Sequence, residues 1–467
     1  MEKIDDNDLQ ENSSKALIGP SMSVILAALG ISSAAVVLPQ ISNEFQNTQL
    51  DQSLVVSAYI LAVTALIVPA GRAGDMFGKR NILLGGLILF LFGIVFSYFS
   101  STLLQLVIAR LFQGAGAAAM MAMPLAQVRE IVPKEQTGRW MGIMGTMSAI
   151  GTASGPALAG IIASHFDWRY VFLFQVPITL LTFILCIIYL KANTRLSRQS
   201  KIDYAGALAL ILLLSFFVLF MSDIKAGIDK GAMLLLTITC LMLASFCWIE
   251  KYAYSPLIPI KLLKSLHVRI SLVMNATVSL IMMGILIVGP YFLTLGLGLT
   301  TAQMGLVMSI GPITSAFSGV PAGRLTENQG VQKTLIIGLI GMGGASAAMA
   351  GLPYMFGLSG FILAFMCLTP SYQIFLAALN TSVMENTSHQ DHGVTSGLLN
   401  LSRNFGFILG ASIFSPIFWL IANTDEGVLE EADRFSKAMA GTFIFASLLV
   451  LSILVLWLIL KRFEHED

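Results

Sequence analysis

Long apolar runs recur along the whole chain, and short polar stretches separate them. A helix needs about 20 mostly apolar residues to cross the hydrocarbon core of a bilayer. Read with that length, the pattern predicts fourteen membrane-spanning helices, near residues 17–39, 52–71, 82–100, 102–126, 138–163, 168–190, 204–222, 231–250, 268–292, 302–323, 332–351, 354–381, 393–421 and 437–460. We therefore expect an all-α polytopic membrane protein.

The positive charges predict how these helices are oriented. Cytoplasmic segments of membrane proteins carry an excess of Lys and Arg. With the amino terminus placed in the cytoplasm, 20 of the 27 basic residues fall in inner segments and five in outer segments. The other two, Arg110 and Arg403, lie within spans. This bias predicts that both termini are cytoplasmic.

The chain also contains an internal repeat. The stretch PAGRAGDMFG at 69–78 returns as PAGRLTENQG at 321–330. Four glycines recur at a common offset of 255 residues: Gly138, Gly142, Gly151 and Gly155 match Gly393, Gly397, Gly406 and Gly410. Two related six-helix halves with a pair of extra helices between them explain both matches. The predicted parts are a cytoplasmic tail (1–16), a six-helix bundle (17–190), a basic loop with two extra helices and a linker (191–266), a second bundle (267–460) and a cytoplasmic tail (461–467).

Composition changes this picture little but excludes some classes of protein. Only 11% of the residues are charged and 56% are hydrophobic, against roughly a quarter charged in soluble domains. The net charge of +1 gives no electrostatic reason to expect a nucleic-acid partner. The four cysteines lie inside apolar runs without metal-like spacing, so we expect small core residues and no metal site.

Three stretches stand out as candidate functional motifs. The first is 71–80, GRAGDMFGKR, where Gly71 and Gly78 permit a tight connection between helices. Asp75 can face the positive end of a neighbouring helix, while Lys79 and Arg80 stay near the inner headgroups. The alternative is a tight basic turn without a gating role.

The second motif is 110–116, RLFQGAG, in the fourth predicted span. A guanidinium there costs roughly 2.5–3.5 kcal/mol on insertion scales, so Arg110 should face a wet cavity or a partner. Gln113 lies one turn away on the same face. The alternative is a buried arginine satisfied by backbone carbonyls.

The third motif is 151–160, GTASGPALAG, in the fifth predicted span. Gly151, Gly155 and Gly160 allow helices to approach closely, and Pro156 interrupts the hydrogen-bond ladder of the helix.

Together these motifs resemble the major facilitator superfamily, and more narrowly its fourteen-span drug:proton antiporters, over nearly the whole chain. The resemblance implies that the Asp75 loop is a latch for one conformation, that Arg110 takes part in proton coupling, and that 151–160 marks an antiporter. Met76 replaces the arginine that usually follows the aspartate, and Ala159 replaces one closing glycine. A bacterial inner membrane is the location that the resemblance implies.

The spans contain no acidic residue near mid-membrane; all 26 acids fall in termini, loops or span ends. Relatives that pump multivalent cations often carry an aspartate about where Gly30 stands. The polar residues predicted around a cavity are instead two arginines and neutral amides: Arg110, Gln113, Asn275, Gln373, Asn380, Asn400, Arg403 and Asn404. A similar arginine occurs at the position of Arg403 in other fourteen-span members, so the alternative for Arg403 is an architectural role. Such a cavity should disfavour organic cations and admit neutral, zwitterionic or anionic compounds.

We expect a secondary transporter that exports small amphipathic compounds by proton antiport with alternating access, as a monomer and without a cofactor other than the proton gradient. The alternative is a dedicated exporter of one neutral or anionic metabolite, such as a siderophore. A membrane enzyme or sensor would need a catalytic cluster or a soluble domain, and the sequence carries no HExxH, GxSxG or phosphate-binding loop.

Overall fold

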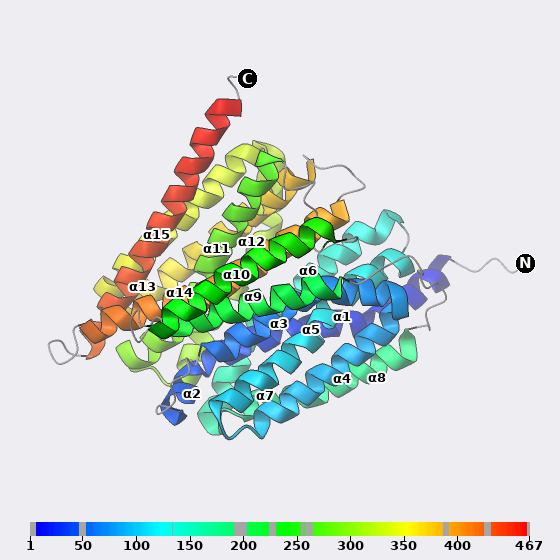
Figure 1. Cartoon of the computed structure of the whole chain (residues 1–467), viewed down its shortest axis with the longest axis horizontal. Helices are drawn as coiled ribbons and strands as arrows, with labels where there is room; N and C mark the ends of the chain where they lie inside the picture. The colour runs from blue at the N-terminus through cyan, green and yellow to red at the C-terminus, as the bar shows by residue number, and fades with distance from the viewer. Residues whose placement is uncertain are drawn as a thin grey trace, which may run out of the picture. The chain divides into compact units, whose positions relative to one another are not determined.

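The structure, a computed structural model, describes residues 6–45, 53–132, 134–190, 203–223, 230–253, 256, 265–385, 392–424 and 431–464. All regular secondary structure in these residues is helical (Figure 1). The helices are α1 (Asp6–Val36), α2 (Leu38–Glu44), α3 (Leu54–Phe77), α4 (Lys79–Tyr98), α5 (Leu103–Ile131), α6 (Lys134–His165), α7 (Tyr170–Leu173), α8 (Gln175–Tyr189), α9 (Tyr204–Asp223), α10 (Lys230–Tyr252), α11 (Leu266–Tyr291), a π-helical turn (Phe292–Gly296), α12 (Thr301–Gln329), α13 (Val331–Glu385), α14 (His392–Thr424) and α15 (Glu431–Glu464). The predicted all-α membrane fold is confirmed.

Within the described residues, twelve helices are long and apolar enough to cross a membrane. One of them, α13, contains a break at Gly357, where φ is 54° and ψ is −126°. Residues 205–220 of α9 form a shorter apolar helix in addition to the twelve. The count of fourteen spans stays a prediction.

The chain divides into two compact units. The first contains residues 1–34, 44–216 and 237–257, and the second contains residues 35–43, 217–236 and 258–467. In the first unit, α5 packs along both α3 and α4. In the second, α11 packs along α14, and α13 packs along α12 and α15. Figure 1 shows these neighbours within each unit.

The repeated glycines make equivalent helix contacts in the two units. A Cβ added to Gly151 of α6 would overlap the carbonyl oxygen of Ile25 in α1. A Cβ added to Gly406, its partner in the repeat, would overlap the carbonyl oxygen of Ala276 in α11. Gly155 and Gly410 make the next contacts along the same helix pairs, against Ser32 and Leu280 respectively. The packing of the other repeated glycines, Gly138, Gly142, Gly393 and Gly397, lies outside the described residues.

The two copies of the PAGR stretch also end alike. Gly78 separates α3 from α4 with a φ of 97°, and Gly330 separates α12 from α13 with a φ of 82°. Both values lie in a region that residues with a Cβ rarely adopt. The sequence repeat is therefore a repeat of backbone conformation as well.

The prediction that the cysteines are core residues was wrong for three of the four. Cys186 is buried, whereas Cys240, Cys247 and Cys367 are exposed. The surface of a spanning helix faces lipid, so an apolar run does not distinguish a core residue from a lipid-facing one. The same reasoning applies to α10, of whose most apolar window only 17% is buried.

Candidate functional site

The first candidate site surrounds Arg110, whose side chain is fully buried on α5. Its Nε donates a hydrogen bond to the carbonyl oxygen of Val55 at 3.1 Å, and its Nη2 donates to the carbonyl oxygen of Gly30 at 2.7 Å. Its Nη1 donates to the side-chain oxygen of Gln113. All three nitrogens of the guanidinium therefore have acceptors, and two of these are backbone carbonyls.

Aromatic and amide side chains complete this cluster. The guanidinium carbon of Arg110 lies 4.3 Å from the ring centre of Tyr59, a cation–π distance. The Tyr59 hydroxyl donates to the carbonyl oxygen of Ala27 at 2.8 Å. Gln113 donates to Gln175 of α8 at 3.3 Å, and Gln175 donates in turn to the carbonyl oxygen of Val171. The polar groups of α1, α3, α5 and α8 are thus tied together in one buried network.

This network fits the second of the two interpretations of Arg110, the buried arginine satisfied by carbonyls. Because each of its three nitrogens already donates a hydrogen bond, a substrate anion there would compete with carbonyl acceptors that α1 and α3 provide. The geometry makes Arg110 a positioning residue that joins helices of the first unit.

The second candidate site surrounds Arg403 on α14, which is only partly buried. Its Nη2 donates to the side-chain oxygen of Asn400 at 2.8 Å, while its enclosed Nε has no acceptor among the described residues. The hydroxyl of Tyr372, on α13, lies within electrostatic reach of the guanidinium and beside Ser279 of α11. Asn275, also on α11, donates to the carbonyl oxygen of Leu399 at 2.7 Å, one turn before Arg403.

The two arginines inside spans therefore differ. Arg110 is buried and has acceptors for all three nitrogens, whereas Arg403 is partly exposed and makes a single side-chain hydrogen bond within the described residues. In this part of the chain Arg403 forms no ion pair. Arg403 consequently offers the better place for an anionic group to bind.

The remaining predicted cavity amides differ in their burial and partners. Gln373 of α13 donates to the hydroxyl of Ser315 in α12 at 2.5 Å, and Asn404 is 5% exposed. Asn380 is exposed on α13.

Most of the predicted gating loop is helical. Residues from Gly71 to the end of α3 continue that helix, and Gly78 alone breaks it before Lys79 begins α4. The Nζ of Lys79 lies 2.5 Å from the Glu130 carboxylate, on α5, and 3.9 Å from the Asp75 carboxylate. Arg80 donates to the carbonyl oxygen of Ile187 at 3.0 Å. The segment lies where the C-terminal ends of α3, α5 and α8 meet the N-terminal end of α4.

The third predicted motif is a helix contact in the structure. Gly151 and Gly155 of α6 approach α1 as described above, and Pro156 and Gly160 are buried beside them. The close approach expected from the glycine spacing is present.

The stretch 167–172, DWRYVF, was predicted to be an interfacial anchor in which Arg169 pairs with Asp167, and the structure adds Glu44 to this pair. Arg169 lies 2.6 Å from the Glu44 carboxylate of α2 and 3.3 Å from Asp167, so Glu44 and not Asp167 is its nearer partner. The indole nitrogen of Trp168 donates to Glu44 at 2.5 Å, and Trp168 is 3% exposed. The hydrogen bond from Arg169 holds the pKa of the Glu44 carboxyl below its ordinary value.

Acidic residues in the twelve candidate spans lie only near span ends. There are four among the described residues: Asp75, Glu250, Glu327 and Asp433. The same residues contain no group of three or more His, Cys, Asp or Glu that could hold a metal ion.

Comparison with known proteins identifies the class. Residues 21–411 match the Major Facilitator Superfamily, and the chain belongs to this family. It is therefore a transporter of that superfamily, not an enzyme.

Curated relatives are similar along most of their length. The probable transport protein HsrA of Haemophilus influenzae is 25% identical over 96% of this chain and 95% of its own. The riboflavin transporter RibZ of Clostridioides difficile is 26% identical over 85% of this chain and 86% of its own. The multidrug resistance protein Stp of Mycobacterium tuberculosis is 26% identical over 89% of this chain and 78% of its own.

Solved structures share the fold. The nucleoside transporter NupG superposes with a TM-score of 0.64 at 10% identity, covering 95% of this chain and 99% of that one. The human organic anion transporter MFSD10 gives a TM-score of 0.58 at 13% identity, with the same coverage.

Sequence reasoning missed several members of these clusters. Tyr59 and Gln175 complete the Arg110 network, and Tyr372 lies within electrostatic reach of Arg403. Of these three residues, only Gln175 stands out in the sequence, as a lone amide within an apolar run. Gly30 and Val55 contribute backbone carbonyls, which no side-chain pattern reveals.

Proposed function

We propose that this chain exports small amphipathic compounds from the cytoplasm of a bacterium by proton antiport, as a fourteen-span member of the superfamily that works as a monomer. The observation that carries the transport mechanism is the repeated helix contact, α6 on α1 and α14 on α11. Two units with equivalent internal packing suit an alternating-access cycle, in which each moves largely as a rigid body.

Fourteen crossings fit the described helices. The break at Gly357 divides α13 into two segments, each longer than the roughly 20 residues that a crossing needs. α9 has 20 residues and is apolar along its length. An even number of crossings, together with the Lys and Arg bias of the sequence, supports a cytoplasmic location for both termini.

The preferred substrates are neutral or anionic. Arg403 supplies a positive charge that no described side chain neutralises, and no described span carries an acid near its middle. A hydrogen bond to a charged group contributes about 1.5–3 kcal/mol. An anionic group on Arg403 would therefore bind substantially more strongly than an organic cation. Asn275 and Asn400 add amide groups for neutral parts of the substrate.

Proton coupling would then depend on acids at span ends. Asp75 is half exposed and lies 3.9 Å from Lys79, which also contacts Glu130. Protonation of Asp75 would weaken its attraction to Lys79 at the junction of α3 and α4, which is where the latch of the family is expected.

A second candidate function is a dedicated exporter of one neutral or anionic metabolite. The similarity to a protein named as a riboflavin transporter supports it, because that name specifies one compound. The two candidates share the site around Arg403 and differ in how many compounds they accept.

Proton flux in everted membrane vesicles tests the proposal. The probes are ethidium, 1-naphthamide and 1-naphthoate, as cation, neutral compound and anion, with vesicles lacking the protein to subtract passive movement. We expect the neutral and anionic probes to collapse the pH gradient and ethidium to have little effect. In Arg403→Gln, the half-saturating concentration of naphthoate should rise about ten-fold or more while that of naphthamide stays unchanged.

Arg324→Gln is the matched control, because Arg324 is exposed near the end of α12 and lies outside the Arg403 cluster. High-affinity ethidium transport would overturn the proposed substrate charge. If the wild-type protein responds to one metabolite and to none of several such probes, broad export is contradicted and the dedicated export function is supported.

A further inference from the structure

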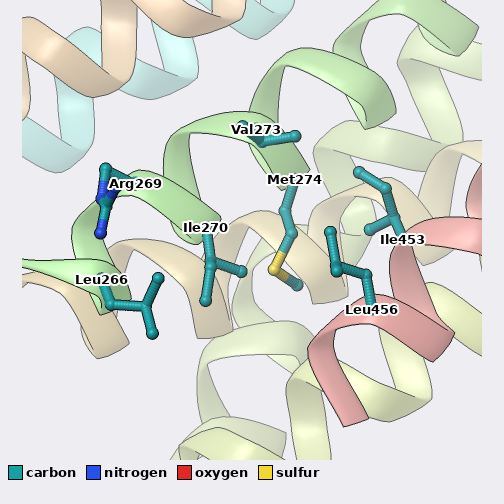
Figure 2. Close-up of a pocket in the computed structure, with 7 residues that line it drawn as sticks. All are labelled: Leu266, Arg269, Ile270, Val273, Met274, Ile453 and Leu456. Carbon is teal, nitrogen blue, oxygen red and sulfur yellow. The ribbon is translucent and has the colours of Figure 1, made fainter. Parts of the chain in front are cut away.

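A lateral pocket lies between α11 and α15 of the second unit, and none of its lining residues belongs to the Arg403 cluster. Its lining residues are Leu266, Arg269, Ile270, Val273, Met274, Ile453 and Leu456. Figure 2 shows Ile270 and Met274 of α11 facing Ile453 and Leu456 of α15, with Leu266 and Arg269 at the far edge. The pocket has a volume of about 130 Å³. This is close to the ~150 Å³ of an apolar cavity that holds benzene.

The pocket is apolar and opens to the outer surface of the helices. Met274 and Ile453 form its floor, at 1% and 7% exposure. Val273 and Leu456 form its rim, at 52% and 45% exposure. In a membrane-spanning chain, such a rim faces the lipid phase rather than water. The volume suits a few methylene groups of a hydrocarbon chain.

Arg269 gives this pocket a charge at one end. The residue is exposed and lies in the first turn of α11, four residues after the helix cap Ser265. Within the described residues its side chain makes no hydrogen bond or ion pair. Arginine binds phosphate oxygens readily, and one basic residue near an anionic membrane surface contributes about 1 kcal/mol.

We propose that this pocket binds an anionic phospholipid, with one acyl chain between α11 and α15 and the phosphate on Arg269. The arrangement matches the two parts of such a lipid: an apolar slot among lipid-facing side chains, and an exposed guanidinium near the beginning of α11. The sequence before α11 adds Lys261 and Lys264, which have the same sign of charge. The lipid would bridge α11, which begins the second repeat, and α15, which ends it.

The occupant is a lipid rather than a transported compound for a geometric reason. A substrate passing through the protein would need polar contacts on several sides, whereas six of the seven lining side chains are hydrocarbon or thioether. Free phosphate would use Arg269 but leave the slot empty. The proposal therefore commits to the membrane lipid as the source of the phosphate, and it does not depend on which compounds the protein exports.

The test measures the thermal unfolding of purified, delipidated protein with added phosphatidylglycerol or phosphatidylcholine of identical acyl chains. We expect phosphatidylglycerol to half-saturate at about five-fold lower concentration than phosphatidylcholine. Arg269→Gln should abolish this preference, and the control Arg324→Gln should keep it. Val273→Trp, which fills the rim, should weaken both lipids.

Several results would overturn the proposal. One is equal stabilisation of the wild type by both lipids, and another is a phosphatidylglycerol preference that survives in Arg269→Gln. Stabilisation by inorganic phosphate alone would show an ion site without a lipid. Unchanged lipid binding in Val273→Trp would show that no acyl chain binds in the pocket. Because Arg269→Gln is compared between two lipids, a general loss of stability does not imitate the loss of preference expected for it.

Discussion

The guanidinium of Arg110 donates a hydrogen bond to the carbonyl oxygen of Gly30 over 2.7 Å. This contact ties α5 to α1 at the position where cation-pumping relatives are expected to carry an aspartate. A Cβ at Gly30 would lie 3.0 Å from the Tyr59 hydroxyl, so the site is tight as well as polar. The arginine and the glycine are thus parts of one packed unit.

Arg110→Lys should therefore lower stability as well as transport. Lysine presents a compact ammonium and cannot reach Val55, Gly30 and Gln113 in the planar arrangement of a guanidinium. A buried acceptor left unsatisfied costs about 1–3 kcal/mol, so we expect a clear fall in the unfolding temperature. Thermal unfolding in detergent, beside a transport assay, makes the measurement.

Unchanged stability of Arg110→Lys, together with loss of proton-coupled transport, would contradict this interpretation. Arg110 would then have the proton-coupling role that the family resemblance implies. Arg403→Lys is a useful comparison, because the single hydrogen bond of Arg403 to Asn400 predicts a smaller loss of stability.

The repeated glycine contacts predict paired effects in the two units. Gly151→Ala and Gly406→Ala would each force a methyl group into a backbone carbonyl of the neighbouring helix. Overpacking of this kind typically costs about 1–3 kcal/mol. Gly145→Ala is the control, because a Cβ at this position of α6 would meet nothing within 4 Å. The unfolding temperature should fall in both tested variants and stay level or rise in the control.

The sequence predicted the class of fold, the repeat and the glycine contacts, because helix length and glycine spacing act locally. It did not predict which polar side chains meet. Arg110 and Arg403 look alike as single charges in apolar runs. Their difference arises from the carbonyls of Gly30 and Val55 and from Tyr59, which belong to helices distant in the chain. Likewise, Arg169 could not be assigned to Glu44 without the fold, since Asp167 is nearer in sequence.

The glycines between consecutive helices give a second paired prediction. Gly78→Ala and Gly330→Ala should each cost about 1–3 kcal/mol, because their φ values of 97° and 82° strain a residue with a Cβ. Gly71→Ala and Gly323→Ala, seven residues earlier in each copy, are the matched controls, since a Cβ there meets nothing within 4 Å. Circular dichroism melting of the four variants makes the comparison. Equal melting of test and control variants would show that the backbone relaxes at these junctions.

The ion pair between Glu44 and Arg169 predicts a dependence of stability on pH. The pKa of Glu44 is lowered from 4.5 in the folded protein. A lowered pKa stabilises the fold at pH values above the unfolded pKa, and this stabilisation is lost as the pH falls through the folded pKa. Glu44 is 38% exposed, so screening limits the contribution to about 1 kcal/mol or less.

Glu44→Gln should accordingly melt at a lower temperature than the wild type at pH 7, and the difference should shrink as the pH is taken below 4.5. Glutamine keeps an oxygen that can accept from Trp168, so the comparison isolates the charge. Asp167→Asn should have the smaller effect at pH 7, because Asp167 lies 3.3 Å from Arg169 and Glu44 lies 2.6 Å from it. A difference that persists unchanged at acid pH would mean that packing, and not the carboxylate charge, accounts for the loss.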